Sequence, residues 1–131
     1  MYQEPPPPVR SWRDKFGDSF RGLKAGIRKQ SSFFVHFFVA AVVLMAAAVL
    51  KIHRDQWYIL LLCITIVLTA EMFNSALESM ARAITGESNP HLGNALDIAS
   101  AAVLVASTGA AIVGAIIFLH QVAEWWRAGA G

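Results

Sequence analysis

Charge is scarce in this sequence. Only 15% of its 131 residues are Asp, Glu, Lys or Arg, whereas a typical soluble domain is about one quarter charged. Hydrophobic residues make up 56% of the chain, and its mean hydropathy is +0.48. A chain of this length is expected to form one domain. The composition therefore argues against an ordinary soluble globular domain.

Several signals of soluble or secreted proteins are also missing. The single cysteine, Cys63, cannot form an internal disulfide, and its place in an apolar run indicates a packing role. No CxxC, GxGxxG or GxxxxGK[ST] motif occurs, which excludes the nucleotide-binding loops of soluble enzymes. The first apolar run begins at Phe33 and exceeds the roughly 7–15 residues of a signal-peptide core. We expect it to stay in the membrane.

Three long apolar runs are present, over residues 33–50, 57–73 and 98–119. A transmembrane helix needs about 20 predominantly apolar residues. The second run meets this length only if its helix continues past Glu71. Because none of the runs has a polar face, they are more typical of membrane spans than of core helices in a soluble bundle. The sequence predicts an all-α membrane protein with three transmembrane helices.

Basic residues are concentrated before the first span. Seven of the eleven lie there, and the positive-inside rule then places the N-terminus in the cytoplasm. We therefore expect a multi-pass protein of the inner (cytoplasmic) membrane. The end of the second span and the start of the third would face the cytoplasm.

The N-terminal arm divides into two parts. Residues 1–10 contain PPPP and are expected to be extended and disordered. Residues 11–31 predict an amphipathic helix in the membrane interface. Two interpretations of its basic residues stay open. They either only set the orientation of the protein in the membrane, or they also face an anionic substrate such as a nucleotide phosphate. We assign residues 33–119 to the three-span domain and 120–131 to a tail. The apolar stripe of the helix consists of Trp12, Phe16, Phe20, Leu23 and Ile27.

The stretch AEMFNSALE carries the candidate chemistry. Glu71, Asn74 and Glu78 fall on one face of a helix. A carboxylate at the centre of a span costs about 2.5–3.5 kcal/mol, and less near the end of the span. Glu71 lies within the second apolar run or at its end, so it is partly desolvated, which suits a general base. Glu78 lies ~10 Å further along the axis, in water, and suits Mg²⁺. Asn74 would orient either acid, and Asp97 would join them from the third span. The alternative is a structural polar cluster that caps helix ends or holds the spans together.

Small residues recur every four positions in the third span and predict close helix packing and self-association. We expect His36, Ser107 and Thr108 to be packing or hydrogen-bonding groups rather than ligands. The two ladders are Ala102, Ala106, Ala110 and Gly114, and Ser107, Ala111 and Ala115.

AEMFNSALE, followed by ALDIASAAVLVA, resembles the paired motifs of the small prokaryotic integral-membrane lipid kinases, the diacylglycerol kinase and undecaprenol kinase family. The family pattern is approximately E-[ML]-x-N-[ST]-A-[IL]-E and then A-K-D-x-x-[SA]-[AG]-A-V-L. The resemblance covers about residues 13–119. It implies a homotrimer with a surface helix and three spans per subunit. It also implies transfer of the γ-phosphoryl group of MgATP to a hydroxyl of diacylglycerol or undecaprenol at the cytoplasmic face.

The resemblance assigns roles by position. Glu71 matches the base that takes the proton of the lipid hydroxyl, Asn74 a residue that supports the site, and Glu78 a ligand of Mg²⁺ on ATP. Asp97 matches an acid near the nucleotide, and Ser100 a position beside the lipid. We also place Glu87 at the nucleotide and Trp57 at the lipid.

Two positions depart from the family pattern. Gln30 stands where the family has a glutamate that helps Glu78 hold the metal, and an amide is a weaker, neutral ligand. Leu96 replaces the lysine of A-K-D, which removes a cation that would neutralise phosphate charge. Phosphoryl transfer depends on such neutralisation. Arg82, one turn after Glu78, is the nearest replacement.

Three functions are compatible with the sequence. The first is an ATP-dependent lipid kinase, favoured because both glutamates, Asn74 and Asp97 are retained. The second is a non-catalytic trimeric membrane protein that binds lipid or nucleotide. The third, a cation conductor with a carboxylate ring, is disfavoured because no polar face runs through the second or third span.

Overall fold

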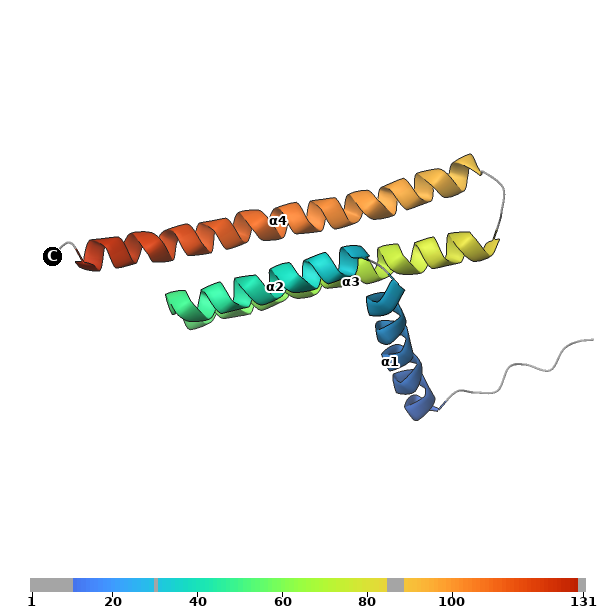
Figure 1. Ribbon diagram of the computed structural model, residues 1–131, viewed down its shortest axis with the longest axis horizontal. Coiled ribbons are helices and arrows are strands. Elements are labelled where there is room, and N and C mark those ends of the chain that lie inside the picture. Colours follow the sequence, from blue (N-terminus) through green and yellow to red (C-terminus); the bar gives the residue numbers. More distant parts are fainter. Residues whose placement is uncertain (1–10, 30, 85–88, 130–131) are drawn as a thin grey trace, which may run out of the picture.

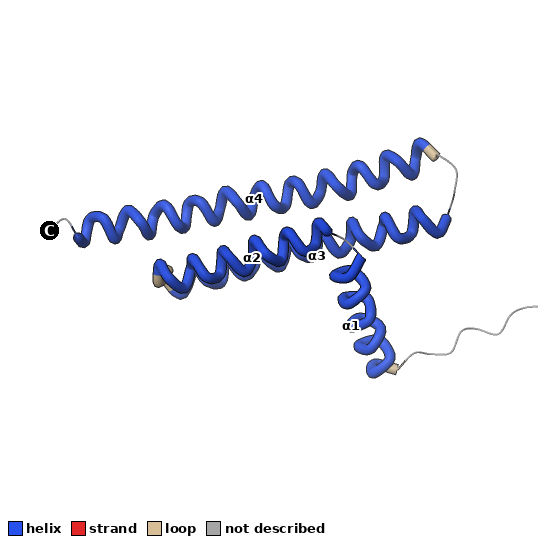
Figure 2. Tube along the Cα trace, in the orientation of Figure 1, coloured by secondary structure: helices blue, strands red, loops and turns tan. Residues whose placement is uncertain are grey.

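The computed structural model describes residues 11–29, 31–84 and 89–129. The chain forms four helices, α1 (Trp12–Lys29), α2 (Ser31–Leu50), α3 (Arg54–Ile84) and α4 (Pro90–Gly129). Helices α2, α3 and α4 run side by side, and α1 leaves this bundle at a steep angle (Figure 1). Nearly all of the described chain is helical (Figure 2). The expectations for residues 1–10, Gln30 and Glu87 fall outside the described residues.

Helices α2, α3 and α4 are long and apolar enough to cross a membrane. This finding supports the predicted three-span membrane protein over a soluble bundle. The helix that carries the second apolar run continues past Glu71 to Ile84, so this run meets the length that a transmembrane span needs. At 1.5 Å per residue, α3 is about 46 Å long and α4 about 60 Å, whereas the hydrocarbon core is about 30 Å thick. Both helices therefore extend beyond the apolar layer, and residues 120–129, which we predicted as a tail, continue α4.

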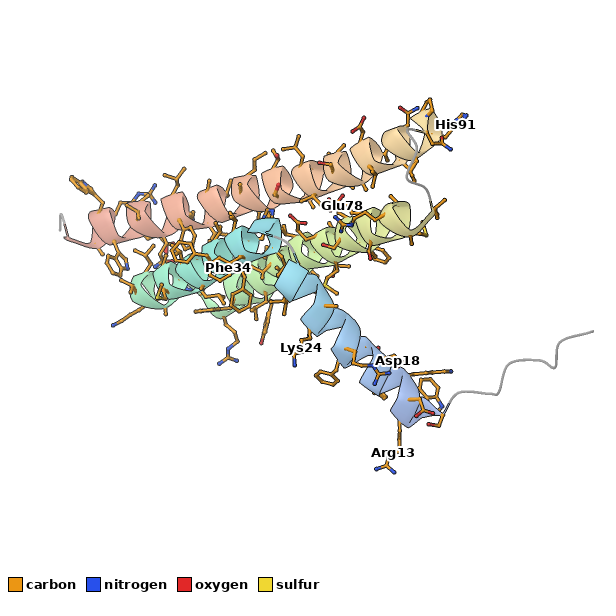
Figure 3. All side chains as sticks on the ribbon, turned by 45° about the vertical axis from the view of Figure 1, so that its right-hand side comes forward. Arg13, Asp18, Lys24, Phe34, Glu78 and His91 are labelled. Atoms are coloured by element: carbon orange, nitrogen blue, oxygen red, sulfur yellow. The ribbon has the colours of Figure 1, made fainter. Side chains whose placement is uncertain are left out.

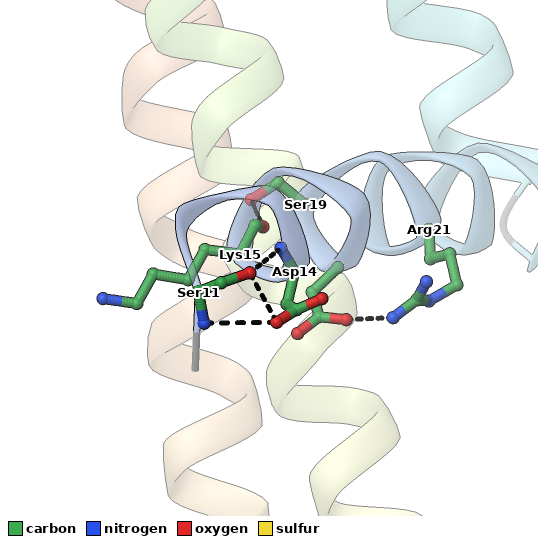
Figure 4. Close-up of polar contacts among 6 residues, drawn as sticks. Ser11, Asp14, Lys15, Ser19 and Arg21 are labelled. Carbon is green, nitrogen blue, oxygen red and sulfur yellow. Dashed lines mark hydrogen bonds and ion pairs between the residues drawn. The ribbon is translucent and has the colours of Figure 1, made fainter. Parts of the chain in front are cut away.

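Helix α1 begins with a reciprocal cap. The Ser11 hydroxyl accepts a hydrogen bond from the Asp14 amide at 3.2 Å, and the Asp14 carboxylate accepts one from the Ser11 amide at 3.1 Å. This arrangement satisfies two backbone donors that a helix start leaves free. One turn later, Asp18 pairs with Arg21 (Figure 4). The local sequence is thus sufficient to start α1 at Trp12.

The turn between α2 and α3 follows the Schellman pattern. The amide of Lys51 donates to the Ala48 carbonyl, and the amide of Ile52 donates to the Ala47 carbonyl, both at 3.3 Å. Lys51 adopts a left-handed conformation with φ of 52°. The buried Ile52 then packs against Ala47. The turn closes α2 and α3 into an antiparallel hairpin.

The start of α4 is set by Asn89 and Pro90. The side-chain oxygen of Asn89 accepts hydrogen bonds from the amides of His91 at 3.0 Å and Leu92 at 3.4 Å. Proline at the first helical position needs no amide partner. The helix therefore begins about two turns before the apolar run that starts at Ile98.

The apolar core lies at the hairpin end of the bundle. Ala47, Ile52, Leu60 and Ile117 are buried together, and the half-buried Trp57 packs against them. Most large apolar side chains are instead exposed, as expected for helices surrounded by lipid. Examples on the three long helices are Phe34, Phe37, Phe38, Leu62, Ile66, Val105, Ile116 and Leu119.

A largely apolar cavity of about 290 Å³ lies between α2, α3 and α4. The small residues Ser107, Ala110, Ala111, Gly114 and Ala115 line it. In the described part of the chain, a Cβ atom at Gly114 would have no neighbour within 4 Å. This part of the two small-residue ladders therefore faces the cavity.

Candidate functional site

Glu71 is buried inside the bundle of apolar helices. Its side chain is only 3% exposed, and Oε1 lies 3.0 Å from Nε2 of His36 on α2. His36 thus has a polar partner on α3, and its role as a hydrogen-bonding group stays a prediction. Because a buried carboxylate is costly unless it is paired, this contact helps α3 to keep an acid among apolar side chains.

The second oxygen of Glu71 has a different environment. Oε2 is buried and has no hydrogen-bond partner in the part of the chain that the structure describes. A buried polar atom left without a partner costs about 1–3 kcal/mol. Such an atom is an available acceptor for the proton of a hydroxyl that reaches the site.

Glu78 lies two turns further along α3, on the same face and in a more open environment. Its side chain is 35% exposed. The amide of Asn74 donates a hydrogen bond to Oε1 at 3.0 Å, and Nη2 of Arg82 lies 3.9 Å from Oε2. Figure 3 shows Glu78 on the stretch of α3 that continues past the junction of α1 and α2. The spacing thus gives one buried and one accessible acid, as expected, and Asn74 contacts the outer one.

Helix α1 crosses α3 beside these acids. A Cβ atom at Gly26 would lie 2.8 Å from Sδ of Met72, the residue after Glu71. Around this crossing, a cavity of about 240 Å³ lies between the two helices, with Ser75, Ser79 and Arg82 on its α3 side. The absence of a side chain at Gly26 allows α1 to approach α3 at the level of the buried acid.

The remaining predicted residues lie apart from this cluster. Asp97 and Ser100 are exposed on α4, and Leu96 is half-buried there. Trp57 lies in the apolar core near the start of α3, about 21 Å along the helix from Glu71. Within the described ranges, no three His, Cys, Asp or Glu side chains are grouped as metal ligands. The two glutamates and Asn74 are brought together on one helix face, whereas the roles of Asp97, Ser100 and Trp57 stay predictions.

The contact between His36 and Glu71 was not anticipated from the sequence. A signal was nevertheless present, because α2 and α3 form an antiparallel hairpin. His36 lies about 21 Å from the end of α2, and Glu71 about 26 Å from the start of α3. Two polar residues at matching depth in adjacent apolar helices are expected to pair.

Comparison with known proteins agrees with this geometry. The family model for prokaryotic diacylglycerol kinase matches residues 17–118. The chain is 32% identical to a diacylglycerol kinase of Synechocystis sp. over 105 residues, which cover 79% of this chain and 60% of that protein. It is 30% identical to the undecaprenol kinase of Bacillus subtilis over 117 residues, which cover 86% of this chain and 95% of that protein.

A diacylglycerol kinase of Pseudomonas aeruginosa is 29% identical over 103 residues, which cover 79% of this chain and 84% of that protein. The matched region contains all of α2 and α3 and most of α4. It therefore includes the buried acid, the outer acid and Asn74. The chain belongs to the prokaryotic diacylglycerol kinase family.

Proposed function

We propose that this protein is an ATP-dependent lipid kinase that transfers the γ-phosphoryl group of MgATP to the hydroxyl of a membrane lipid. The observation that carries the proposal is the buried Oε2 of Glu71, which has no hydrogen-bond partner among the described residues and lies two turns from the accessible carboxylate of Glu78. The relatives are named diacylglycerol kinase and undecaprenol kinase. Their names support a lipid alcohol, either diacylglycerol or undecaprenol, as the acceptor.

In this mechanism Glu71 acts as the general base. Its Oε2 takes the proton of the lipid hydroxyl while the hydroxyl oxygen forms a bond to the γ-phosphorus of ATP. The bond from that phosphorus to the β,γ-bridging oxygen breaks, ADP departs, and Glu71 releases its proton to water. General-base catalysis typically contributes about 10²–10⁴-fold to the rate. The low-dielectric surroundings of Glu71 suit this role, because little water competes for its free oxygen.

Glu78 is the residue that would hold Mg²⁺. Magnesium is commonly bound by one or two carboxylates together with substrate phosphates, so a single accessible glutamate fits a metal that arrives with ATP. The ion would neutralise phosphate charge as the phosphoryl group moves. Asn74 fixes the orientation of the Glu78 carboxylate, and Arg82 adds a cation beside it. Gln30 and Glu87 are further proposed contributors to the metal and nucleotide sites.

We place the site at the cytoplasmic end of the bundle in the inner membrane. The positive-inside rule supports a cytoplasmic N-terminus. Helix α1 would lie in the interface as an amphipathic helix, with its aromatic residues in the lipid. Trp12, Phe16 and Phe20 are 74%, 64% and 72% exposed, as suits immersion in lipid.

A homotrimer is proposed as the functional assembly. The small residues around Gly114 line a cavity between the helices of one chain, and small residues favour close helix contact in lipid. Asp97 and Ser100 are exposed on α4. Association would let them approach the nucleotide and lipid, which is the role that we propose for them, and Trp57 would contact the lipid.

The test is a lipid kinase assay with purified protein, Mg²⁺, [γ-³²P]ATP and either diacylglycerol or undecaprenol in mixed micelles. We expect labelled lipid with the wild type and loss of label with Glu71→Gln. Glu124→Gln is the matched control, because Glu124 lies near the C-terminal end of α4, far from Glu71 and Glu78, and pairs with His53. Absence of label with both lipids would overturn the proposal and favour a non-catalytic member of the family.

A further inference from the structure

We propose that His36 is a positioning residue that fixes Glu71 so that one carboxylate oxygen is held and the other is reserved for the lipid hydroxyl. This inference rests on the proposed kinase function and deepens it. The residue comes from α2, whereas the acid belongs to α3. The geometry of the base would therefore depend on packing between two helices.

The contact makes the two oxygens of Glu71 inequivalent. Oε1 lies 3.0 Å from Nε2 of His36, a normal distance for a hydrogen bond from nitrogen to a carboxylate. Oε2 is buried and has no partner within residues 11–29, 31–84 and 89–129. A general base must lie within about 2.6–3.2 Å of the group that it deprotonates. The fixed Oε1 therefore defines where Oε2 lies, and Oε2 is the atom that receives the proton.

The surroundings of His36 support this role. Its side chain is 24% exposed and forms part of the wall of the apolar cavity between α2, α3 and α4. Val39, Val67 and Leu68 are among the other residues that line this cavity. Apolar neighbours offer the imidazole no competing hydrogen bonds. Ser107 also lines this cavity, and its hydroxyl donates a hydrogen bond to the carbonyl of Leu104 at 3.1 Å. The polar contact of the imidazole is with Glu71.

A purely structural clamp would be built differently. Apolar side chains of similar volume often stabilise a protein as well as a buried charged pair does, or better. A clamp would also leave no carboxylate oxygen unsatisfied, since that costs about 1–3 kcal/mol. The arrangement of one held and one free oxygen is more costly than either alternative. A function for the free oxygen explains why it is retained.

The experiment compares His36→Leu with His36→Gln in the lipid kinase assay. Misplacement of a catalytic group by about 1 Å can lower the rate about 100-fold. We expect His36→Leu to lower kcat by about that factor while KM for MgATP stays within about twofold. His36→Gln keeps a side-chain N–H donor and should recover most of the rate. His120→Leu is the matched control, because His120 is exposed at the far end of α4.

Two further measurements make the result decisive. In ¹⁵N-histidine-labelled protein, the side-chain Nε2 resonance of His36, assigned by its loss in His36→Leu, should shift in Glu71→Gln. In the double variant His36→Leu/Glu71→Gln, kcat should fall no further than in Glu71→Gln alone, because groups that act as a unit are not additive. Thermal denaturation in detergent verifies that each variant is folded.

The possible failures are distinguishable. Active wild type together with an equally active, folded His36→Leu variant overturns this inference and leaves the kinase proposal standing. An Nε2 resonance that does not respond to Glu71→Gln also overturns it, whatever the activity. A wild type that labels neither lipid overturns the proposed function and this inference with it.

Discussion

The side-chain amide of Asn74 donates a hydrogen bond to Oε1 of Glu78 at a distance of 3.0 Å. The two residues are one turn apart on α3, so the contact is formed within a single helix. It leaves Oε2 of Glu78 on the side of Arg82. Asn74 therefore belongs with the outer, accessible acid and not with the buried one.

Replacing Asn74 by Ala should weaken the use of MgATP. The hydrogen bond to a charged group contributes about 1.5–3 kcal/mol when it is shielded from water, and Glu78 is partly exposed, so we expect the lower end of this range. A tenfold change corresponds to about 1.4 kcal/mol. The value of kcat/KM for MgATP should fall about tenfold, while KM for the lipid changes little. Steady-state kinetics with ATP and lipid varied separately measure both effects.

Thr69→Ala provides the control for Asn74→Ala. Thr69 is an exposed residue of α3, and by helical periodicity it lies on the face away from both acids. Its substitution should leave both kinetic constants unchanged. If Asn74→Ala raised KM for the lipid and spared MgATP, Asn74 would act on the inner acid instead.

Arg82→Ala should reduce turnover without destabilising the protein. Arg82 is 65% exposed, and its Nη2 lies 3.9 Å from Glu78. Exposed pairs of this kind contribute only about 0–1 kcal/mol to stability. The cation would instead act on phosphate charge, because Leu96 occupies the position of the family lysine. We expect kcat/KM for MgATP to fall at least tenfold and the melting temperature to stay within about 2 °C. Near-wild-type turnover would rule out compensation by Arg82, and Arg127→Ala at the far end of α4 is the control.

Leu96→Lys should have the opposite effect. Leu96 is half-buried on α4, next to the exposed Asp97. A lysine there would restore the A-K-D pattern and a cation for the phosphates. A charge-assisted hydrogen bond gives about 1.5–3 kcal/mol, which corresponds to a rise of about tenfold or more in kcat/KM for MgATP. The test is the same kinetic assay with Leu96→Gln as the uncharged control. Equal rates in the lysine and glutamine variants would show that no cation is needed at this position.

Features encoded within one helix could be predicted from the sequence, and those formed between helices mostly could not. The spacing of Glu71 and Glu78 placed both acids on one face at two depths, because helical periodicity alone determines it. The pairing of Glu71 with His36 depends on how α2 packs against α3, so the AEMFNSALE motif does not show it, and its one signal is the matching depth of the two residues in their helices. The early start of α4 had a local signal in Asn89 and Pro90, but the apolar run that begins later was the stronger pattern.

The size of the side chain at position 26 should control the approach of α1 to the buried acid. A Cβ atom there would lie 2.8 Å from Sδ of Met72. The end of a methionine side chain is flexible, so Gly26→Ala should lower activity less than about threefold. The larger Gly26→Val should separate the helices and lower kcat by about 100-fold, since small displacements of a catalytic site are costly.

The double variant Gly26→Val/Met72→Ala tests this steric cause. It should recover a large part of the lost rate, because it removes the atoms that valine would meet. Gly22→Val is the control, since no described residue lies within 4 Å of a Cβ atom built at Gly22. Failure of the double variant to recover, with Gly22→Val equally impaired, would point to loss of helix flexibility instead of a clash.

Lys51→Gly should stabilise the protein without changing its activity. Lys51 has φ of 52° in the Schellman turn after α2, a conformation that costs a residue with a Cβ atom about 1 kcal/mol or more. Glycine adopts it freely but loses more backbone entropy on folding. The net gain should be about 0.5–1 kcal/mol in the free energy of unfolding, measured by chemical denaturation in mixed micelles. Ala48→Gly, within the last turn of α2, is the matched control and should destabilise by about 1 kcal/mol. If both variants destabilised the protein equally, the left-handed conformation of Lys51 would not be a source of strain.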